Sequence, residues 1–374
     1  MTSGWLAWFL RCCATGWHRL TRWWQQSRTD RHAGPFVPPI YVLALWSLLS
    51  GCAPCCDAGT DERVVQLGYF PNVTHGVALV GTGRGLFARA LGADVRLKER
   101  VFAAGPSAVE ALFAGQLDIG YIGPGPAVNG FLKSRGRALR IVAGAASGGA
   151  GLVAREDAGI ASIADLAGRR VVVPQIGGTQ DVALRHALGA AGLRATDRGG
   201  NVTVIGAAPS DALALFLRRE VDAAWVVEPW VSRLIREGRG RLVLDERALW
   251  PEGRFSTVCV VMRTGFLEKH PDLARRFLQA HVETARWIEG HRSAAGNVIR
   301  ERIRQLTGKG LPEGVVRDAL NRIVFTTDPL QGTVLETARR AQALGYLRED
   351  LNLLENLFDL QPLAEAEKQV ARHR

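Results

Sequence analysis

The sequence predicts an α/β protein in which two similar lobes, each a mixed but mainly parallel sheet flanked by helices, face each other across a ligand cleft. The first observation is an internal repeat: Pro106–Phe113 recurs 103 positions later as Pro209–Phe216. Each copy is followed by an acidic residue, an apolar strand and a proline. The second is the alternation of strand and helix patterns along the chain, which is typical of parallel sheets covered by helices. Two copies are too few for a solenoid, so the repeat indicates two related lobes.

The bulk composition is that of a globular protein. The 374 residues are 47% apolar and 22% charged, which allows a sizeable core and about two domains of roughly 150 residues each. The formal net charge of +11 is compatible with an anionic ligand. Nucleic-acid binding requires a basic stripe with interleaved aromatic residues. The arginines here are scattered, so no nucleic-acid partner is predicted.

The first 62 residues have the pattern of an export segment followed by a tether. Residues 40–50 form an apolar stretch of 11 residues, too short for the roughly 20 that span a bilayer. The stretch ends in Leu49-Ser50-Gly51-Cys52, which resembles the lipobox of bacterial lipoproteins. The resemblance implies removal of residues 1–51, acylation of Cys52 and a tether over 52–62. Several acyl chains would anchor the mature protein to the membrane.

Hydrophobic periodicity predicts the elements that follow, in chain order. Strands are expected over 64–70, 95–102, 118–122, 139–145, 152–155, 171–174, 202–205, 223–227 and 255–263. Helices are expected after the turn 71–75 and over 107–114, 125–135, 181–188, 209–217, 271–291, 296–307, 312–323 and 331–344.

Three further expectations complete this prediction. The glycine-rich residues 147–151 are expected to carry the chain into the second lobe. The strand 255–263 is expected to pair with 152–155 near the return crossing. Residues 351–374 are expected to form a polar tail.

The sequence contains no recognisable catalytic motif. The sequence shows no Ser-His-Asp or Cys-His constellation and no metal-ligand spacing among its eight histidines. Cys259 lies in the apolar run 258–262 and is predicted to be a small buried hydrophobic residue. The sequence therefore predicts a binding module without cofactor or metal, rather than an enzyme.

Seven short motifs, in order along residues 63–345, resemble the extracytoplasmic solute-binding proteins of ABC importers in the nitrate, taurine and aliphatic-sulfonate family. These motifs are Tyr69–Gly76, Gly105–Leu112, Leu117–Pro124, Ile141–Ala150, Gly178–Asp181, Glu228–Trp230 and Gly265–Pro271.

The resemblance implies a type II periplasmic-binding-protein clamshell, in which two hinge crossovers let the lobes close on a ligand. Residues 63–149 with 257–374 would form lobe 1, and residues 150–256 lobe 2. The protein would be a monomeric, lipid-anchored periplasmic receptor that delivers a small anionic solute to the transmembrane subunits of an ABC permease. The sequence does not choose between aliphatic sulfonate, taurine and nitrate.

An anionic head group carries acceptors and no donors, so it suits backbone N–H groups at helix starts. The candidate ligand-binding residues lie at predicted helix starts and at the crossover. They are Asn72, His75, Ser107, Pro124, Ser147, Gly148, Gly178, Thr179, Gln180, Glu228 and Trp230. Five of these are predicted to contact the head group: Ser107, Ser147, Gly178, Thr179 and Gln180.

Glu228 would accept from a cationic group such as the amine of taurine, and Trp230 with Phe70 would form an apolar wall.

Local structural roles compete with these assignments. Ser107 and Glu110 have the spacing of a capping box, and Thr179 is suited to cap its own helix. Glu228 is suited to a helix dipole, Gly148 to the hinge, and His75 to a helix start.

Two other functions stay open at the sequence level. One is an enzyme on the same fold, as in the yeast thiamine-pyrimidine synthases, although their cysteine-rich motif is missing here. The other is a ligand-sensing partner of a membrane sensor.

Overall fold

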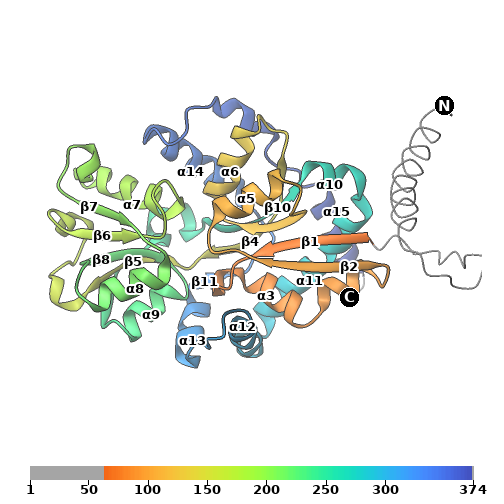
Figure 1. Ribbon diagram of the computed structural model, residues 1–374, viewed down its shortest axis with the longest axis horizontal. Coiled ribbons are helices and arrows are strands. Elements are labelled where there is room, and N and C mark those ends of the chain that lie inside the picture. Colours follow the sequence, from red (N-terminus) through yellow and green to blue (C-terminus); the bar gives the residue numbers. More distant parts are fainter. Residues whose placement is uncertain (1–62, 373–374) are drawn as a thin grey trace, which may run out of the picture. The chain divides into compact units, whose positions relative to one another are not determined.

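The strands of this protein form two separate sheets, as the computed structural model shows (Figure 1). The structure describes residues 63–372, so Cys52, the predicted leader and the tether lie outside the described residues. Sheet A has the strand order β11-β4-β10-β3-β1-β2, and sheet B has the order β7-β6-β8-β5-β9.

The strands of sheet A are β1 (Arg63–Tyr69), β2 (Val95–Val101), β3 (Ile119–Ile122), β4 (Leu139–Gly148), β10 (Ser256–Arg263) and β11 (Ile323–Val324). Those of sheet B are β5 (Ala150–Arg155), β6 (Arg170–Val173), β7 (Thr203–Gly206), β8 (Ala223–Val227) and β9 (Gly240–Asp245).

The helices are α3 (Gly76–Gly83), α4 (Leu86–Leu91), α5 (Gly105–Phe113), α6 (Pro124–Lys133), α7 (Thr179–Ala190), α8 (Pro209–Leu217), α9 (Trp230–Arg236), α10 (Thr264–Lys269), α11 (Pro271–Gly290), α12 (Arg292–Thr307), α13 (Glu313–Arg322), α14 (Gln331–Ala343) and α15 (Gln361–Arg372).

The two sheets share one topology, which explains the sequence repeat. In sheet A, β2, β1 and β3 are parallel neighbours, and the antiparallel β10 lies between β3 and β4. In sheet B, β7, β6 and β8 are parallel neighbours, and the antiparallel β5 lies between β8 and β9. The repeated sequence forms α5-β3-α6 in one case and α8-β8-α9 in the other. The predicted helix–strand–helix unit is therefore confirmed.

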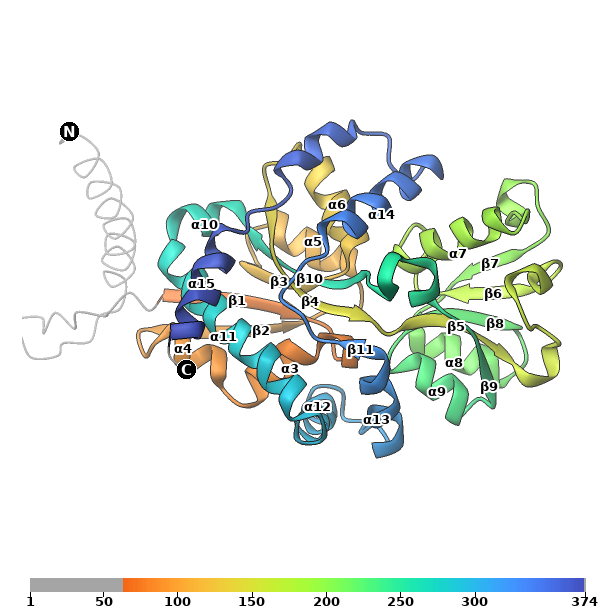
Figure 2. The same ribbon diagram turned by 180° about the vertical axis from the view of Figure 1, so that it is seen from behind.

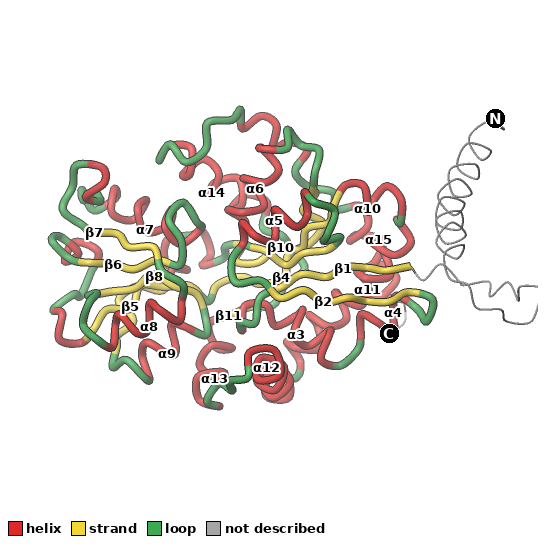
Figure 3. Tube along the Cα trace, in the orientation of Figure 1, coloured by secondary structure: helices red, strands yellow, loops and turns green. Residues whose placement is uncertain are grey.

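Helices cover both faces of each sheet (Figure 3). Alternate residues of β10 show how the faces divide: Val258, Val260 and Met262 belong to the core under α3, α11, α12 and α15. Cys259 and Val261 belong to the opposite core, under α5, α6 and α14. Cys259 is fully buried, as predicted. Sheet B divides likewise between α7 on one face and α8 with α9 on the other.

Two expectations from the sequence about elements are wrong, and two strands were not predicted. The strand 255–263 does not pair with 152–155, because β10 inserts between β3 and β4 while β5 pairs with β8 and β9. Residues 351–374 are not a polar tail: α15 buries Leu363, Ala366 and Val370 against the core that contains α11. The short edge strand β11 and the strand β9 were not anticipated.

The chain crosses between the sheets at two places, and a third segment packs across the contact between them. The first is the turn from β4 to β5, where Gly148 and Gly149 have φ values of 77° and 73° that favour glycine. The second is the linker 246–255, which contains two short 3-10 helices. The third segment runs from α13 through β11 to α14 and is coloured blue in Figure 2. There α13 packs on α9 and α14 packs on α7.

The repeat offers a matched test of backbone strain. Gly115 ends α5 with φ 67°, and Arg219 follows α8 with φ 62°. A non-glycine residue in this left-handed region costs roughly 1–2 kcal/mol. We expect Arg219→Gly to raise the free energy of unfolding by about 1 kcal/mol, since the exposed ion pair of Arg219 with Asp157 contributes little. Urea unfolding measures this change. Gly115→Arg should lower stability by a similar amount, and equal stability of both variants with wild type would contradict the expectation.

Candidate functional site

The starts of α5, α6 and α7 converge beside the crossover between the sheets. A Cβ placed on Gly105 at the start of α5 would lie 2.3 Å from Cγ of Pro126, so the backbones of α5 and α6 approach closely. The N–H of Gly125 in α6 donates to Oγ1 of Thr179, the first residue of α7, at 3.3 Å. This hydrogen bond connects the helix layer of sheet A to that of sheet B. Three helix dipoles therefore direct positive potential into one region.

The start of α6 contributes its dipole but few donors. Pro124 and Pro126 have no N–H group, Gly125 donates to Thr179, and Ala127 donates to the carbonyl of Gly123 at 3.2 Å. Pro124 thus lies at the predicted helix start, but it has no N–H group that could donate to a ligand. Backbone donors for an anion must come from α5 and α7.

The start of α7 keeps donors available. Gly178 donates its N–H to the carbonyl of Gln175 at 3.1 Å, whereas the N–H groups of Thr179 and Gln180 lie in the first turn, where an α-helix provides no partner. Thr179 does not cap its own helix, since the N-cap is Gly178 and makes no side-chain cap bond. Its hydroxyl accepts from Gly125 and retains its own proton to donate.

Ser107 lies at the start of α5, but the capping box expected for it is wrong. The helix begins two residues earlier, at Gly105, with Ala104 as N-cap and Pro106 in the first turn. Ser107 is exposed, and its hydroxyl donates to the carbonyl of Ala104 at 2.8 Å. Its N–H group belongs to the first turn and has no partner within the helix.

Asn72 and His75 serve the turn after β1. The Asn72 side chain accepts from the N–H of Thr74 at 2.9 Å and caps the 3-10 helix Val73–His75. His75 is buried, and its Nδ1 accepts from the N–H of Phe70 at 3.4 Å. Burial lowers the pKa of His75 to about 3, so the ring is neutral near pH 7. The place of His75 matches the helix-start role considered for it from the sequence, whereas the capping role of Asn72 was not considered there.

The crossover residues are buried and bonded to one another. Ser147 accepts from the N–H of Phe255 at 3.2 Å, and Thr257 donates to the carbonyl of Gly148 at 2.6 Å. The carbonyl of Gly149 accepts from the N–H of Glu228 at 2.7 Å. The crossover therefore touches the linker, β10 and the end of β8 in sheet B.

Glu228 directs its carboxylate into the protein. Its oxygens accept from the N–H and the hydroxyl of Ser232 in α9, at 3.0 and 2.9 Å, and from Nη1 of Arg322 in α13 at 3.0 Å. Glu228 is fully buried, and burial raises its pKa above the ordinary value. Glu228 thus serves the start of α9, as considered from the sequence, and it also binds α13.

Trp230 begins α9 and is half-buried. Its ring packs beside the core of sheet B under α8 and α9, and the guanidinium of Arg233 lies 4.7 Å from the ring centre. Phe70 packs against the ring of His75, with centroids 4.5 Å apart. The two aromatic side chains therefore lie on elements of different sheets.

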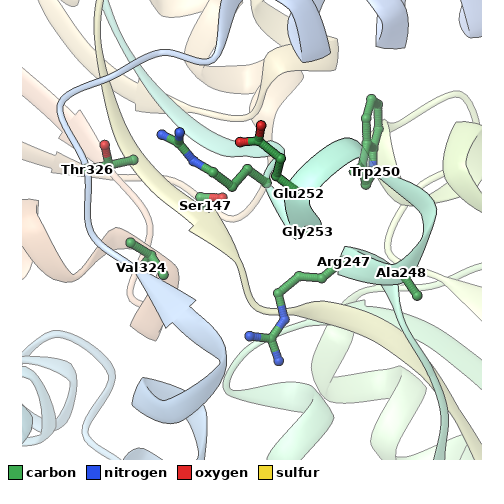
Figure 4. A pocket seen from close by; sticks show the side chains of 9 residues that line it. Ser147, Arg247, Ala248, Trp250, Glu252, Gly253, Val324 and Thr326 are labelled. Carbon is green, nitrogen blue, oxygen red and sulfur yellow. The ribbon is translucent and has the colours of Figure 1, made fainter.

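A cavity of about 640 Å³ borders the crossover (Figure 4). Arg247, Trp250 and Glu252 line it from the linker between the sheets, and Val324 and Thr326 line it from the segment around β11. Ser147 contributes from β4. Because both connections between the sheets and the segment around β11 contribute to its wall, a change in the angle between the sheets would alter this cavity.

Three residues at the contact between the sheets were not found from the sequence. They are Arg322 of α13, Tyr346 beyond α14 and Glu246 of the linker. Their positions depend on how the C-terminal helices dock. No local pattern signals such docking.

Residues 63–372 lack two kinds of feature. No cluster of three or more His, Cys, Asp or Glu residues with metal-binding geometry occurs in that range. None of the helices described there is both long and apolar enough to cross a membrane.

Comparison with known proteins gives matches along most of the chain. The profile of the NMT1-like family matches residues 58–303. A Brucella abortus protein named as a binding protein is 31% identical over 228 residues, which cover 60% of this chain and 66% of that protein. The taurine-binding periplasmic protein of Escherichia coli is 27% identical over 206 residues, covering 55% of this chain and 61% of that protein. The matched region thus spans just under two thirds of these relatives.

Solved structures share the arrangement. The periplasmic aliphatic sulphonate binding protein SsuA from Escherichia coli superposes with a TM-score of 0.65 at 22% identity, covering 79% of this chain and 97% of SsuA. The desulfurization enzyme DSZB superposes with a TM-score of 0.60 at 18% identity, covering 83% of this chain and all of DSZB. Both likenesses concern the fold.

Proposed function

Because the chain belongs to the NMT1-like family and has the two-lobed type II clamshell fold of periplasmic binding proteins, we propose that it is an extracytoplasmic receptor for a small organic anion. The receptor binds the solute between its lobes and delivers it to the transmembrane subunits of an ABC importer. Relatives named as taurine-binding and sulfonate-binding proteins support this class of solute.

One observation carries the proposal: the starts of α5 and α7 present first-turn N–H groups to the region where α6 meets Thr179. Sulfonate and carboxylate groups bring several acceptor oxygens, which such helix starts bind well. The Thr179 hydroxyl adds a donor whose direction is fixed by the bond from Gly125. A neutral or cationic solute would not match this set of donors.

The contacts of Glu228 limit the kinds of solute that we propose. Its carboxylate already accepts from Ser232 and Arg322, so it does not offer a free acceptor for an amine. We therefore favour an aliphatic sulfonate without an amino group over taurine. We also propose that Trp230 and Phe70 form its apolar wall.

We propose the following organisation for the receptor. Lobe 1 comprises residues 63–149 and 257–374, and lobe 2 comprises residues 150–256. The receptor acts as a monomer anchored to the membrane by acylated Cys52.

The protein is proposed to be a receptor rather than an enzyme, although DSZB shows that the same fold supports catalysis. Cys259 is the cysteine that the described region contains, and it is fully buried. Burial raises the pKa of its thiol to about 12, which keeps the sulfur protonated and unreactive near neutral pH.

A solute screen tests this function. The full chain in detergent is heated with small sulfonates, nitrate, taurine and neutral solutes, and saturating ligand at about 100 times its dissociation constant should stabilise it by roughly 2.7 kcal/mol. For the anion that stabilises wild type, we expect Thr179→Val to weaken binding by about 1.5–3 kcal/mol, the scale of a lost hydrogen bond to a charged group. Isothermal titration measures this difference.

Thr179→Ser is the matched control, because it retains the hydroxyl and should bind nearly as wild type does. Equal affinity of the valine and serine variants would remove Thr179 from the site. Stabilisation by neutral solutes alone would refute the anion receptor.

A further inference from the structure

Tyr346 reaches from one lobe to the start of a helix in the other. It follows α14, whose end forms a Schellman motif: Gly345 has φ 68°, its N–H donates to Gln342, and the N–H of Tyr346 donates to Ala341 at 2.9 Å. The next residue, Leu347, is buried in the core under α5, α6 and α14. The backbone of Tyr346 is therefore fixed on both sides.

The hydroxyl of Tyr346 donates to Oδ2 of Asp181 in α7 at 2.6 Å. Asp181 is fully buried. Its Oδ2 also accepts from the N–H of Gly177 at 2.8 Å, and its Oδ1 accepts from Nε of Arg185 at 2.7 Å. One carboxylate thus joins Tyr346, the loop before α7 and the body of α7. Burial and this bond raise the pKa of Tyr346 to about 12, so the phenol stays protonated and remains a donor.

Other contacts hold the ring at this position. The guanidinium groups of Arg185 and Arg198 lie 5.8 and 5.3 Å from the ring centre. Arg198 also donates to the carbonyl of Leu344 at 2.5 Å. A Cβ placed on Gly177 would lie 3.6 Å from the ring, and Gly177 has φ 74°. The loop before α7 is consequently shaped around the tyrosine.

We propose that Tyr346 is a positioning residue that sets the start of α7 against the start of α6. Its hydroxyl holds Asp181 in the first turn of α7, and Asp181 in turn accepts from the N–H of Gly177 in the loop before Thr179. Thr179 in turn holds Gly125. A motion of α14 is therefore transmitted to the place where the helix starts meet. The positioning role does not depend on the proposed function; only the identification of the junction of α6 and α7 as the solute site does.

Hydrogen exchange of the full chain without added solute tests the inference. Tyr346→Phe keeps the ring and removes one hydrogen bond to a charged group. We expect amides in residues 175–182 and 123–127 to exchange about 10- to 100-fold faster, the ratio that such a lost bond implies. Amides of β8 and β9 in the body of sheet B should keep their wild-type rates.

Tyr121→Phe is the matched control. The Tyr121 hydroxyl bonds Nδ1 of His281 at 2.8 Å inside the other core, away from α7. This variant should accelerate exchange near residues 119–122 and 277–285 and leave 175–182 unchanged.

Two results would overturn the inference: wild-type exchange at 175–182 and 123–127 in Tyr346→Phe, or a uniform acceleration over sheet B that indicates only general destabilisation. Since the measurement uses no solute, a failed solute screen would leave it valid, and its failure would leave the solute screen unaffected.

Discussion

Replacing Glu246 by glutamine is expected to raise the free energy of unfolding at pH 8 by about 2 kcal/mol. Glu246 is buried in the linker between the sheets, where it accepts from the indole N–H of Trp225 at 2.8 Å and of Trp250 at 3.4 Å. Burial raises its pKa from 4.5 to about 7. At pH 8 the wild-type protein holds an ionised, poorly solvated carboxylate, which a shift of this size makes unfavourable by about 3 kcal/mol. The neutral amide removes that cost but places its NH2 near one of the indoles.

The pH dependence gives the sign of the effect. A folded-state pKa above the unfolded value means that the folded protein binds the proton more tightly, so the contribution of Glu246 to stability falls as pH rises from about 4.5 to about 7. Urea unfolding at pH 5 and pH 8 should therefore show a large advantage of Glu246→Gln only at the higher pH. Glu313→Gln, at an exposed position, is the control and should match wild type at both. A variant advantage that does not change with pH would contradict this expectation.

Removal of Arg322 is expected to cost about 3–5 kcal/mol of stability. Arg322 is the cation that faces the buried carboxylate of Glu228, and loss of one partner leaves the other charge uncompensated. We expect Arg322→Met to unfold at much lower urea concentration than wild type. Adding Glu228→Gln to that variant should recover about 2 kcal/mol, because the orphaned charge is removed. The two single variants and the double variant together form a double-mutant cycle.

A neighbouring ion pair serves as the control for this cycle. Arg236 pairs with Asp318 at 2.6 Å across the same contact between α9 and α13, but both side chains are partly exposed. Arg236→Met should change stability by no more than about 1 kcal/mol. Comparable losses for both arginines, or no recovery in the double variant, would show that the buried carboxylate does not depend on Arg322.

The parts of the fold that the sequence predicts are those determined by local pattern. A continuous apolar run locates β10, and the repeat around Pro106 and Pro209 locates two equivalent units, because such patterns depend on residues close in the chain. The start of α5 was misplaced by two residues because the serine signal of a cap competes with Pro106, which fits the first helical turn. The amphipathic α15 was missed because its polar face dominates the composition.

For the candidate site, too, local features can be predicted and long-range contacts cannot. The helix start at Thr179 can be predicted because glycine and threonine, which favour helix ends, occur together at this point of the sequence. Whether a side chain at a helix start is free or occupied cannot be predicted, because it depends on distant residues. The carboxylate of Glu228 accepts from Arg322 of α13, and that of Asp181 accepts from Tyr346 beyond α14, both of which follow far along the chain. The sequence contains these residues without any signal of their pairing.

The position of β10 between β3 and β4 has a consequence for how the chain reaches its fold. Ser147 of β4 and Ser256 of β10 are paired in register, yet 109 positions separate them. Bringing together the ends of a flexible segment of that length costs about 4 kcal/mol in entropy. All the strands of sheet B lie inside this segment, so a folded sheet B already holds the two ends near each other. Sheet B therefore acts as an internal scaffold that lowers the entropic barrier to completing sheet A.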